Sequence, residues 1–147
     1  MNKNLRLNIL RKNLLSDSKL KYILSQCTDK KIDDVIHDYT GIPITTNDTR
    51  VDNSFGGINI HYIYHLKNNI VPNDYIDMYV LCGTDLCMND NAMYVVDNLY
   101  LIIAQVIYDI LIQTFPDIKN ISILNTVATH TDGLPCQKAV KLFVRFE

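Results

Sequence analysis

The chain has 147 residues, of which 48% are hydrophobic and 20% are charged, and its formal net charge is −2. This length and composition are typical of one globular domain that can bury a sizeable core, and they exclude a disordered chain. We expect reduced thiols in a cytosolic compartment, because no apolar leader precedes the first charged residues and the four cysteines are scattered: Cys27, Cys82, Cys87 and Cys136.

The charge is distributed unevenly along the chain. Residues 1–31 contain eight Lys and Arg residues against two acidic ones, a balance of +6, so that residues 32–147 carry −8. We interpret the basic segment as a solvated helix face, with contact to nucleic acid or to an acidic partner as the alternative. Only Tyr22 supplies an aromatic ring among the basic residues, so the pattern supports a nucleic-acid surface only weakly.

Leucine spacing predicts two helices in residues 5–27. The first helix carries leucines three and four positions apart, at Leu7, Leu10, Leu14 and Leu15. Ser16 or Asp17 can cap a second, shorter helix. The apolar positions of that helix are Leu20, Ile23 and Leu24.

A third helix is predicted in residues 29–41, with Gly41 as the residue that closes it. Its apolar stripe would consist of Ile32, Val35, Ile36 and Tyr39. Three helices in this order also match a helix-turn-helix DNA-binding domain. The segment that would read DNA, residues 44–57, is rich in Thr, Asn and Asp and has only Arg50 as a base-reading cation. We therefore favour a loop or an irregular edge strand in residues 44–57.

Two strands joined by a turn are predicted next. Residues 58–67 alternate, with Ile, Tyr and Leu on one face and mostly polar side chains on the other. Residues 68–74 have the composition of a turn. Residues 75–83 form the second strand, and the side chains that share its apolar face are Ile76, Met78, Val80 and Cys82.

The strongest element is one long helix from about Asn91 to Thr114, with Asn89 or Asp90 as its cap. Its length would suffice to cross a membrane. A narrow polar stripe argues against that, and it consists of Asn98, Gln105, Asp109 and Gln113. We predict a helix packed on a sheet, with a subunit neighbour on its flank as an open alternative. The predicted core positions are Ile103, Val106 and Ile110.

The pair Asp132 and Gly133 lies between two alternating runs, which predicts a hairpin of residues 120–130 and 134–146. Helices, strands, a long helix and a hairpin in this order predict an α+β fold. We expect an antiparallel sheet of about four strands with the helices on one side.

We expect a single domain over residues 1–147. Within it, residues 1–41 would be helical, and residues 44–147 would hold the sheet and the long helix.

The search for catalytic motifs is mostly negative. The chain has no phosphate-binding glycine loop, no G-x-S-x-G and no HExxH. His130, Asp132 and Cys136 lie close together, but a tight hairpin turn explains an aspartate at this place without any site. We therefore predict no catalytic residue and no cofactor.

Three sets of residues are candidates for binding a metal ion. His61 and His65 cannot share one ion if they lie on a strand, because four residues of strand span about 13 Å. The pair Cys82 and Cys87 with a further ligand stays open as an alternative. A divalent-metal nuclease would use an acidic pair and a Lys on a central strand, but the predicted strands contain no Asp/Glu-x-Lys triplet. The aspartates considered for that role are Asp52, Asp74, Asp77 and Asp85.

The order of elements resembles the small tail-terminator and tail-completion proteins of tailed bacteriophages. The segments that carry the resemblance are "LRLNILRKNLLSDSKLKYIL", "YIDMYVLCG", "AMYVVDNLYLIIAQVIYDILIQ" and "ISILNTVATHTDGLPCQKAVKLFVRFE". The resemblance covers most of the chain from Leu5 to Glu147, and residues 28–57 depart from it, with a third helix and a long polar stretch in place of a shorter link.

The resemblance implies a structural virion protein, assembled in the host cytoplasm, that forms an oligomeric ring, often a hexamer, at the head–tail junction. Its partners would be other copies of itself, the tail tube and head-completion proteins, with no membrane involved. DNA would pass through the lumen without specific binding, and the −8 balance of residues 32–147 is compatible with a lumen that repels phosphates.

We expect such a ring to assemble through open sheet edges. The candidate edges are residues 44–57 and the strand that ends at Glu147. The candidate interface residues are Thr45, Thr46, Asn47, Asp48, Arg50 and Asp52. Two alternatives stay open: a small DNA-binding regulator that uses the helices of residues 16–50, and a divalent-metal nuclease.

Overall fold

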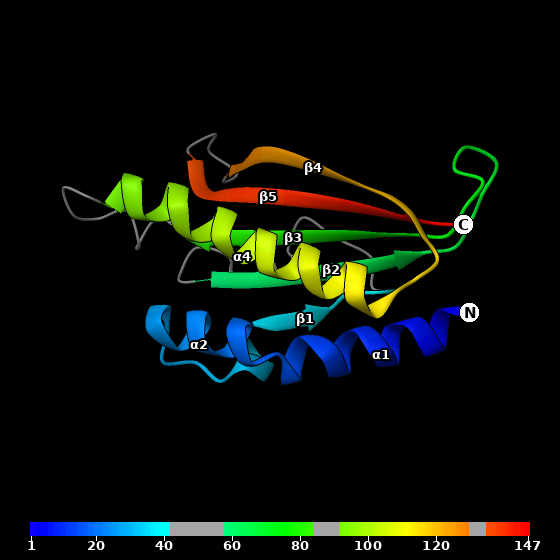
Figure 1. Cartoon of the computed structure of the whole chain (residues 1–147). Coiled ribbons are helices and arrows are strands. Elements are labelled where there is room, and N and C mark those ends of the chain that lie inside the picture. The colour runs from blue at the N-terminus through cyan, green and yellow to red at the C-terminus, as the bar shows by residue number, and fades with distance from the viewer. Residues whose placement is uncertain (42–57, 84–91, 130–134) are drawn as a thin grey trace.

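The computed structural model describes residues 1–41, 58–83, 92–129 and 135–147 and has an α+β fold (Figure 1). Five strands form one sheet in the order β1-β2-β3-β5-β4. Helices α1, α2 and α4 lie on one side of this sheet. The elements are α1 (Lys3–Ser16), α2 (Ser18–Cys27), a short 3-10 turn η1 (Ile32–Asp34), β1 (Ile36–Asp38), β2 (Ile58–His65), β3 (Tyr75–Gly83), α4 (Ala92–Thr114), β4 (Ile118–Thr129) and β5 (Pro135–Phe146).

The two N-terminal helices form as predicted, because each begins at a side-chain cap. The Asn2 side chain accepts a hydrogen bond from the Leu5 N–H at 2.9 Å, and the Asp17 carboxylate accepts one from the Leu20 N–H at 2.8 Å. Asp17 thus ends α1 and begins α2. The leucines that the two helices bury are Leu10, Leu14, Leu20 and Leu24.

The predicted third helix is wrong. Only η1 is helical, and the chain then enters β1, which runs parallel to β2 with Ile36 opposite Ile60. The Ile60 N–H donates to the Val35 carbonyl at 2.8 Å, and the Tyr39 N–H donates to the Tyr62 carbonyl at 2.9 Å. These long-range hydrogen bonds and the burial of β-branched side chains outweigh the local helical spacing.

Gly41 has a positive φ of 76°, as a residue that closes a helix would have, but it follows β1. The helix-turn-helix hypothesis loses its third helix in the same way, because residues 36–38 form a strand. Residues 1–41 are therefore not entirely helical, and the sheet is mixed rather than purely antiparallel.

Strands β2 and β3 confirm the two alternating runs. They pair antiparallel with Ile60 opposite Val80 and Tyr62 opposite Met78, and all four side chains are buried on the helix-covered face. The turn between them is stabilised by the Asn68 side chain, whose oxygen accepts hydrogen bonds from two backbone N–H groups at 2.8 Å.

The predicted hairpin is confirmed in its strand pairing, since β4 and β5 are antiparallel with Ile123 opposite Leu142. The strand that ends at Phe146 is nevertheless not an edge. β5 lies between β3 and β4, so the two edges of the described sheet are β1 and β4. The assignment of an open edge to the strand ending at Glu147 is therefore wrong.

The long helix packs on β5 and β3 through the face that its sequence predicts. Ile103 is 0% exposed, Val106 is 4% exposed and Ile110 is 5% exposed, which confirms the three predicted core positions. Leucines of α1 and α2 and the apolar faces of the strands complete one continuous core. Within the described part of the chain, no helix is apolar enough over a sufficient length to cross a membrane.

Candidate interaction surface

One flank of α4 is apolar and open to solvent. Leu101, Tyr108 and Ile112 are seven and eleven residues apart and so lie on the same side of the helix. Leu101 is 42% exposed, Ile112 is 47% exposed and Tyr108 is half-buried. Helical spacing places this flank on the side of α4 away from Gln113, which faces α1 and α2.

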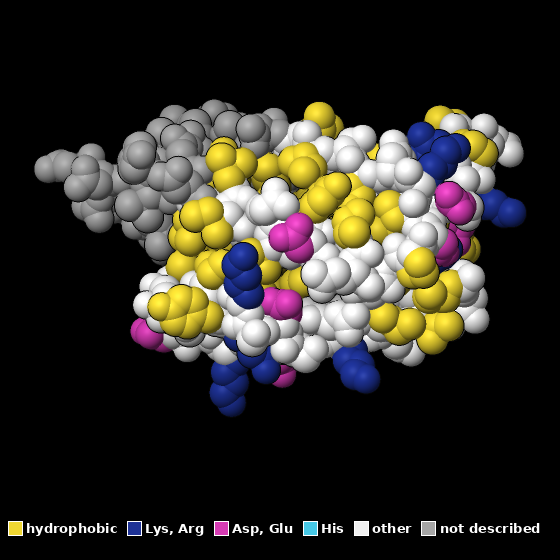
Figure 2. All heavy atoms as spheres, viewed as in Figure 1, with side chains coloured by type: hydrophobic (Ala, Val, Ile, Leu, Met, Phe, Trp, Pro, Cys, Tyr) yellow, Lys and Arg dark blue, Asp and Glu magenta, His cyan; other side chains and the backbone are white. Residues whose placement is uncertain are grey.

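The apolar surface continues onto β4. Ile121 and Ile123 pair with Val144 and Leu142 and point to the helix-covered face of the sheet. Leu142 is fully buried, but Ile123 is 46% exposed, because α4 packs mainly on β3 and β5, while Ile118 and Ile121 at the beginning of β4 are partly buried against the core. The α4–β4 strip is our name for this surface, made of Leu101, Tyr108, Ile112, Ile121 and Ile123. Figure 2 shows hydrophobic side chains gathered in a band over α4. Contiguous apolar surface of this kind is typical of interaction sites.

Strand β4 is also a long edge. Its 12 residues pair with β5 on one side, and no described strand pairs with it on the other. Lys119 near its beginning is exposed, and on the opposite face of the strand the exposed Leu124 follows the polar Asn120 and Ser122. Such edges invite pairing with another chain.

The opposite side of the molecule carries the basic helices. Tyr22 on α2 is 67% exposed, while the other described Tyr and Phe side chains are buried or half-buried. Lys19 and Lys21 beside it are exposed. The interpretation as a solvated basic face holds for most of the segment, with one exception at Arg6, which is 4% exposed.

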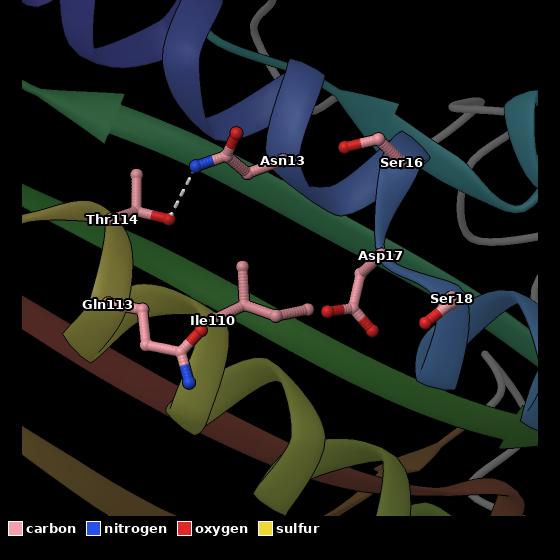
Figure 3. A pocket seen from close by; sticks show the side chains of 7 residues that line it. All are labelled: Asn13, Ser16, Asp17, Ser18, Ile110, Gln113 and Thr114. Atoms are coloured by element: carbon pink, nitrogen blue, oxygen red, sulfur yellow. Dashed lines mark hydrogen bonds between the residues drawn. The ribbon is translucent and has the colours of Figure 1, made fainter.

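A polar recess of about 460 Å³ lies where the junction of α1 and α2 meets α4 (Figure 3). The Asn13 side chain donates a hydrogen bond to the Thr114 hydroxyl at 2.9 Å across it. The only charged side chain in its lining, Asp17, is engaged in capping α2. The polar side chains that line the recess therefore connect α1 to α4. Its lining consists of Asn13, Ser16, Asp17, Ser18, Ile110, Gln113 and Thr114.

Arg6 stands at the centre of a charged network that joins the helices to the sheet. Its guanidinium donates to the Tyr64 hydroxyl at 2.7 Å, lies 3.5 Å from the Asp74 carboxylate and pairs with Asp117. The same guanidinium lies 4.0 Å from the centroid of the Phe146 ring. Arg6 on α1 thus contacts residues on β2 and β5 and residues immediately before β3 and β4.

The network shifts the pKa of Arg6, Tyr64 and Asp74. Burial alone would lower the pKa of Arg6, but the hydrogen bonds to Asp117 and Tyr64 raise it. Burial and the hydrogen bond to Asp74 raise the pKa of Tyr64 to about 12. Burial would raise the pKa of Asp74, but hydrogen bonds from the Tyr64 hydroxyl and the Lys67 N–H lower it below its usual value of 3.8.

Acid should therefore weaken the fold partly through Asp74. Because the pKa of Asp74 is lower in the folded chain, the unfolded chain binds more protons just below the usual value. The contribution of Asp74 to the free energy of unfolding is complete at a pH above the usual pKa. It is lost as the pH falls through the lower pKa of the folded chain. Urea unfolding of the native chain and of Asp74→Asn, compared between about pH 5 and pH 2, should show the difference in stability shrinking as the pH falls. A difference that stays constant over this range would contradict the lowered pKa.

On the other face of the sheet, Asp77 is held between two basic groups. Its carboxylate oxygens lie 3.2 Å from the His65 Nε2 and 3.2 Å from the Lys141 Nζ. Burial would lower the pKa of Lys141, but Asp77 raises it. Asp74 and Asp77 therefore serve separate contacts and do not converge on one point.

The remaining predicted site residues are distributed as follows. His61 and His65 both lie on β2, so the geometric objection to a shared metal ion holds. Cys82 is buried. Within the described residues, no three side chains of metal-ligand type gather in one place. Several considered residues lie outside the described part of the chain: Thr45, Thr46, Asn47, Asp48, Arg50, Asp52, Asp85, Cys87, His130 and Asp132.

No family model, no curated protein and no solved structure matches this chain.

Proposed function

We propose that this protein is a ring-forming structural component of a phage-type virion, at the junction of head and tail. The observation that supports it best is the α4–β4 strip, an apolar surface bordered by a long edge strand. A surface of this kind is costly to leave in water. A structural protein that works as an oligomer would cover it.

The two sides of the molecule also differ, as a ring requires. One side ends at the long edge strand β4, and the other ends at the short strand β1 beside the basic helices. A contact between unlike surfaces repeats from copy to copy. It closes into a ring when the rotation between neighbouring copies is a whole fraction of a full turn. In this proposal, the partners are other copies of the chain, the tail tube and head-completion proteins.

The mass of the purified chain at rising concentration tests the proposal. We expect a defined oligomer by native mass spectrometry and sedimentation, and closed rings with a central channel by electron microscopy. Phage particles made without the protein should contain unjoined heads and tails. A chain that stays monomeric at every concentration and in the presence of tail tubes would sink the proposal.

The sequence-based interface can be tested separately. Replacement of residues 45–54 by a short Gly-Ser linker should weaken assembly if the predicted residues Thr45 to Asp52 contribute to it. If the linker variant assembles as well as the native chain, that choice of interface is wrong while the ring proposal stands.

A further inference from the structure

We infer that neighbouring copies join head to tail, with α2 of one copy covering the α4–β4 strip of the next. This inference rests on the proposed function and names the two surfaces that meet. The strip exposes Leu101, Ile112 and Ile123, and the α2 surface is centred on Tyr22.

The first argument is the offset of the helix layer from the sheet. The helices α1, α2 and α4 cover one face, but α4 packs on β3 and β5, so the layer ends before β4. Ile123 on β4 is consequently 46% exposed although it points to the covered face. A helix of the next copy would cover this exposed part of β4.

The second argument is that α2 lies at the other end of the same layer (Figure 1). It packs inward through Leu20 and Leu24 and exposes Tyr22 outward. An aromatic side chain among polar neighbours is the kind of anchor that interfaces favour, because it buries a large area and loses little rotamer freedom. Placing α2 over β4 of the next copy would therefore continue the helix layer and bury Tyr22 against the strip.

The third argument is charge. Residues 1–31 carry +6, so the exposed lysines of α2 would be attracted to an acidic side chain at the strip of the next copy. Exposed Lys19 and Lys21 flank Tyr22, and exposed Asp109 lies beside the apolar flank of α4. A symmetric contact of strip with strip would leave these lysines unpartnered and would bring two copies of Asp109 into one interface.

Two blocked variants and their mixture test the inference. Leu101→Arg with Ile123→Lys removes apolar area from the strip and repels Lys19 and Lys21. Tyr22→Glu removes the anchor on α2. All three positions are well exposed, so the fold should persist, and Ile70→Lys is a matched control because Ile70 is 90% exposed in the turn between β2 and β3.

We expect each blocked variant alone to be monomeric at a concentration about tenfold above the assembly midpoint of the native chain. The equimolar mixture should give a heterodimer and nothing larger. One copy then contributes an intact α2 and the other an intact strip, while both outer surfaces are blocked. The Ile70→Lys control should assemble like the native chain.

Each other outcome overturns the inference in a recognisable way. If Tyr22→Glu alone still assembles, the strip contacts something other than α2, such as a second strip. If both blocked variants assemble like the native chain, this interface is wrong but the ring proposal stands. If the native chain itself never assembles, the ring proposal fails as well. Should a blocked variant unfold, the milder pair Ile112→Gln and Tyr22→Ser is used in the same mixing experiment.

Discussion

Replacement of Arg6 by alanine should lower the free energy of unfolding by about 3 kcal/mol. Removal of one partner from a buried charged group costs about 3–5 kcal/mol, because the remaining charges stay buried without compensation. Arg6 is itself 4% exposed, but the side chains of Asp74 and Asp117 are 21% and 29% exposed and keep some contact with water. The lower end of the range is therefore expected, and urea unfolding would measure it.

Arg11→Ala is the matched control for this experiment. Arg11 lies on the same helix and is half-buried, and its guanidinium donates a long hydrogen bond of 3.4 Å to the Ile36 carbonyl. It also contacts the Tyr62 hydroxyl, where it opposes the rise in pKa that burial causes. Its removal should cost about 1 kcal/mol or less. If Arg6→Ala and Arg11→Ala unfold at the same urea concentration, the network around Arg6 does not stabilise the fold.

Ile103→Ala should cost about 2–5 kcal/mol, since truncation of a fully buried isoleucine leaves a cavity in addition to the lost apolar contacts. Ile103 is 0% exposed and lies on the face of α4 that packs on the sheet. Ile103→Asp should prevent folding, because a carboxylate would be buried without a partner. Thermal and urea unfolding of the purified variants measure both effects.

The neighbouring residue supplies the control for the core prediction. Ile102 is 49% exposed, so Ile102→Ala removes the same atoms from a solvent-exposed side of the helix. Its cost should stay below about 1 kcal/mol. Equal losses at both positions, or a folded Ile103→Asp variant, would show that the buried face has been assigned to the wrong side of α4.

The sequence predicts correctly those helices and strands whose conformation is decided by residues close together in the chain. The alternation of residues 58–67, the capping residue Asp17 and the apolar spacing of α4 all appear in the structure as expected. Residues 29–41 were misassigned, because Val35 and Ile36 satisfy a helical spacing equally well. Their conformation is decided by hydrogen bonds to β2, a segment that is distant in sequence. The position of β5 between β3 and β4 likewise depends on long-range pairing, which no local period encodes.

The candidate surfaces were predicted less well than the fold. The charge pattern assigns Arg6 to a solvated basic face, although its position four residues before Leu10 and eight before Leu14 puts it on the buried stripe of α1. That spacing was the available signal. No sequence spacing predicts the exposed side of β4, because its exposure depends on how α4 packs on β3 and β5. The predicted interface residues from Thr45 to Asp52 lie outside the described residues.

The central place of β5 in the sheet has a consequence for how the chain folds during synthesis. β5 is made after all the other described strands, at about 5–20 residues per second, yet it separates β3 from β4. Until Phe146 has left the ribosome, β3 has no partner on one side. The Phe146 ring, on which Tyr64 stacks and which Phe115 meets edge-on, is also missing. The nascent chain therefore exposes one open edge of β3 from the synthesis of Gly83 until β5 is made. Folding should be slowed by the pairing of β3 with β5, two segments that are distant in sequence, and chaperone binding should be strongest just before β5 emerges.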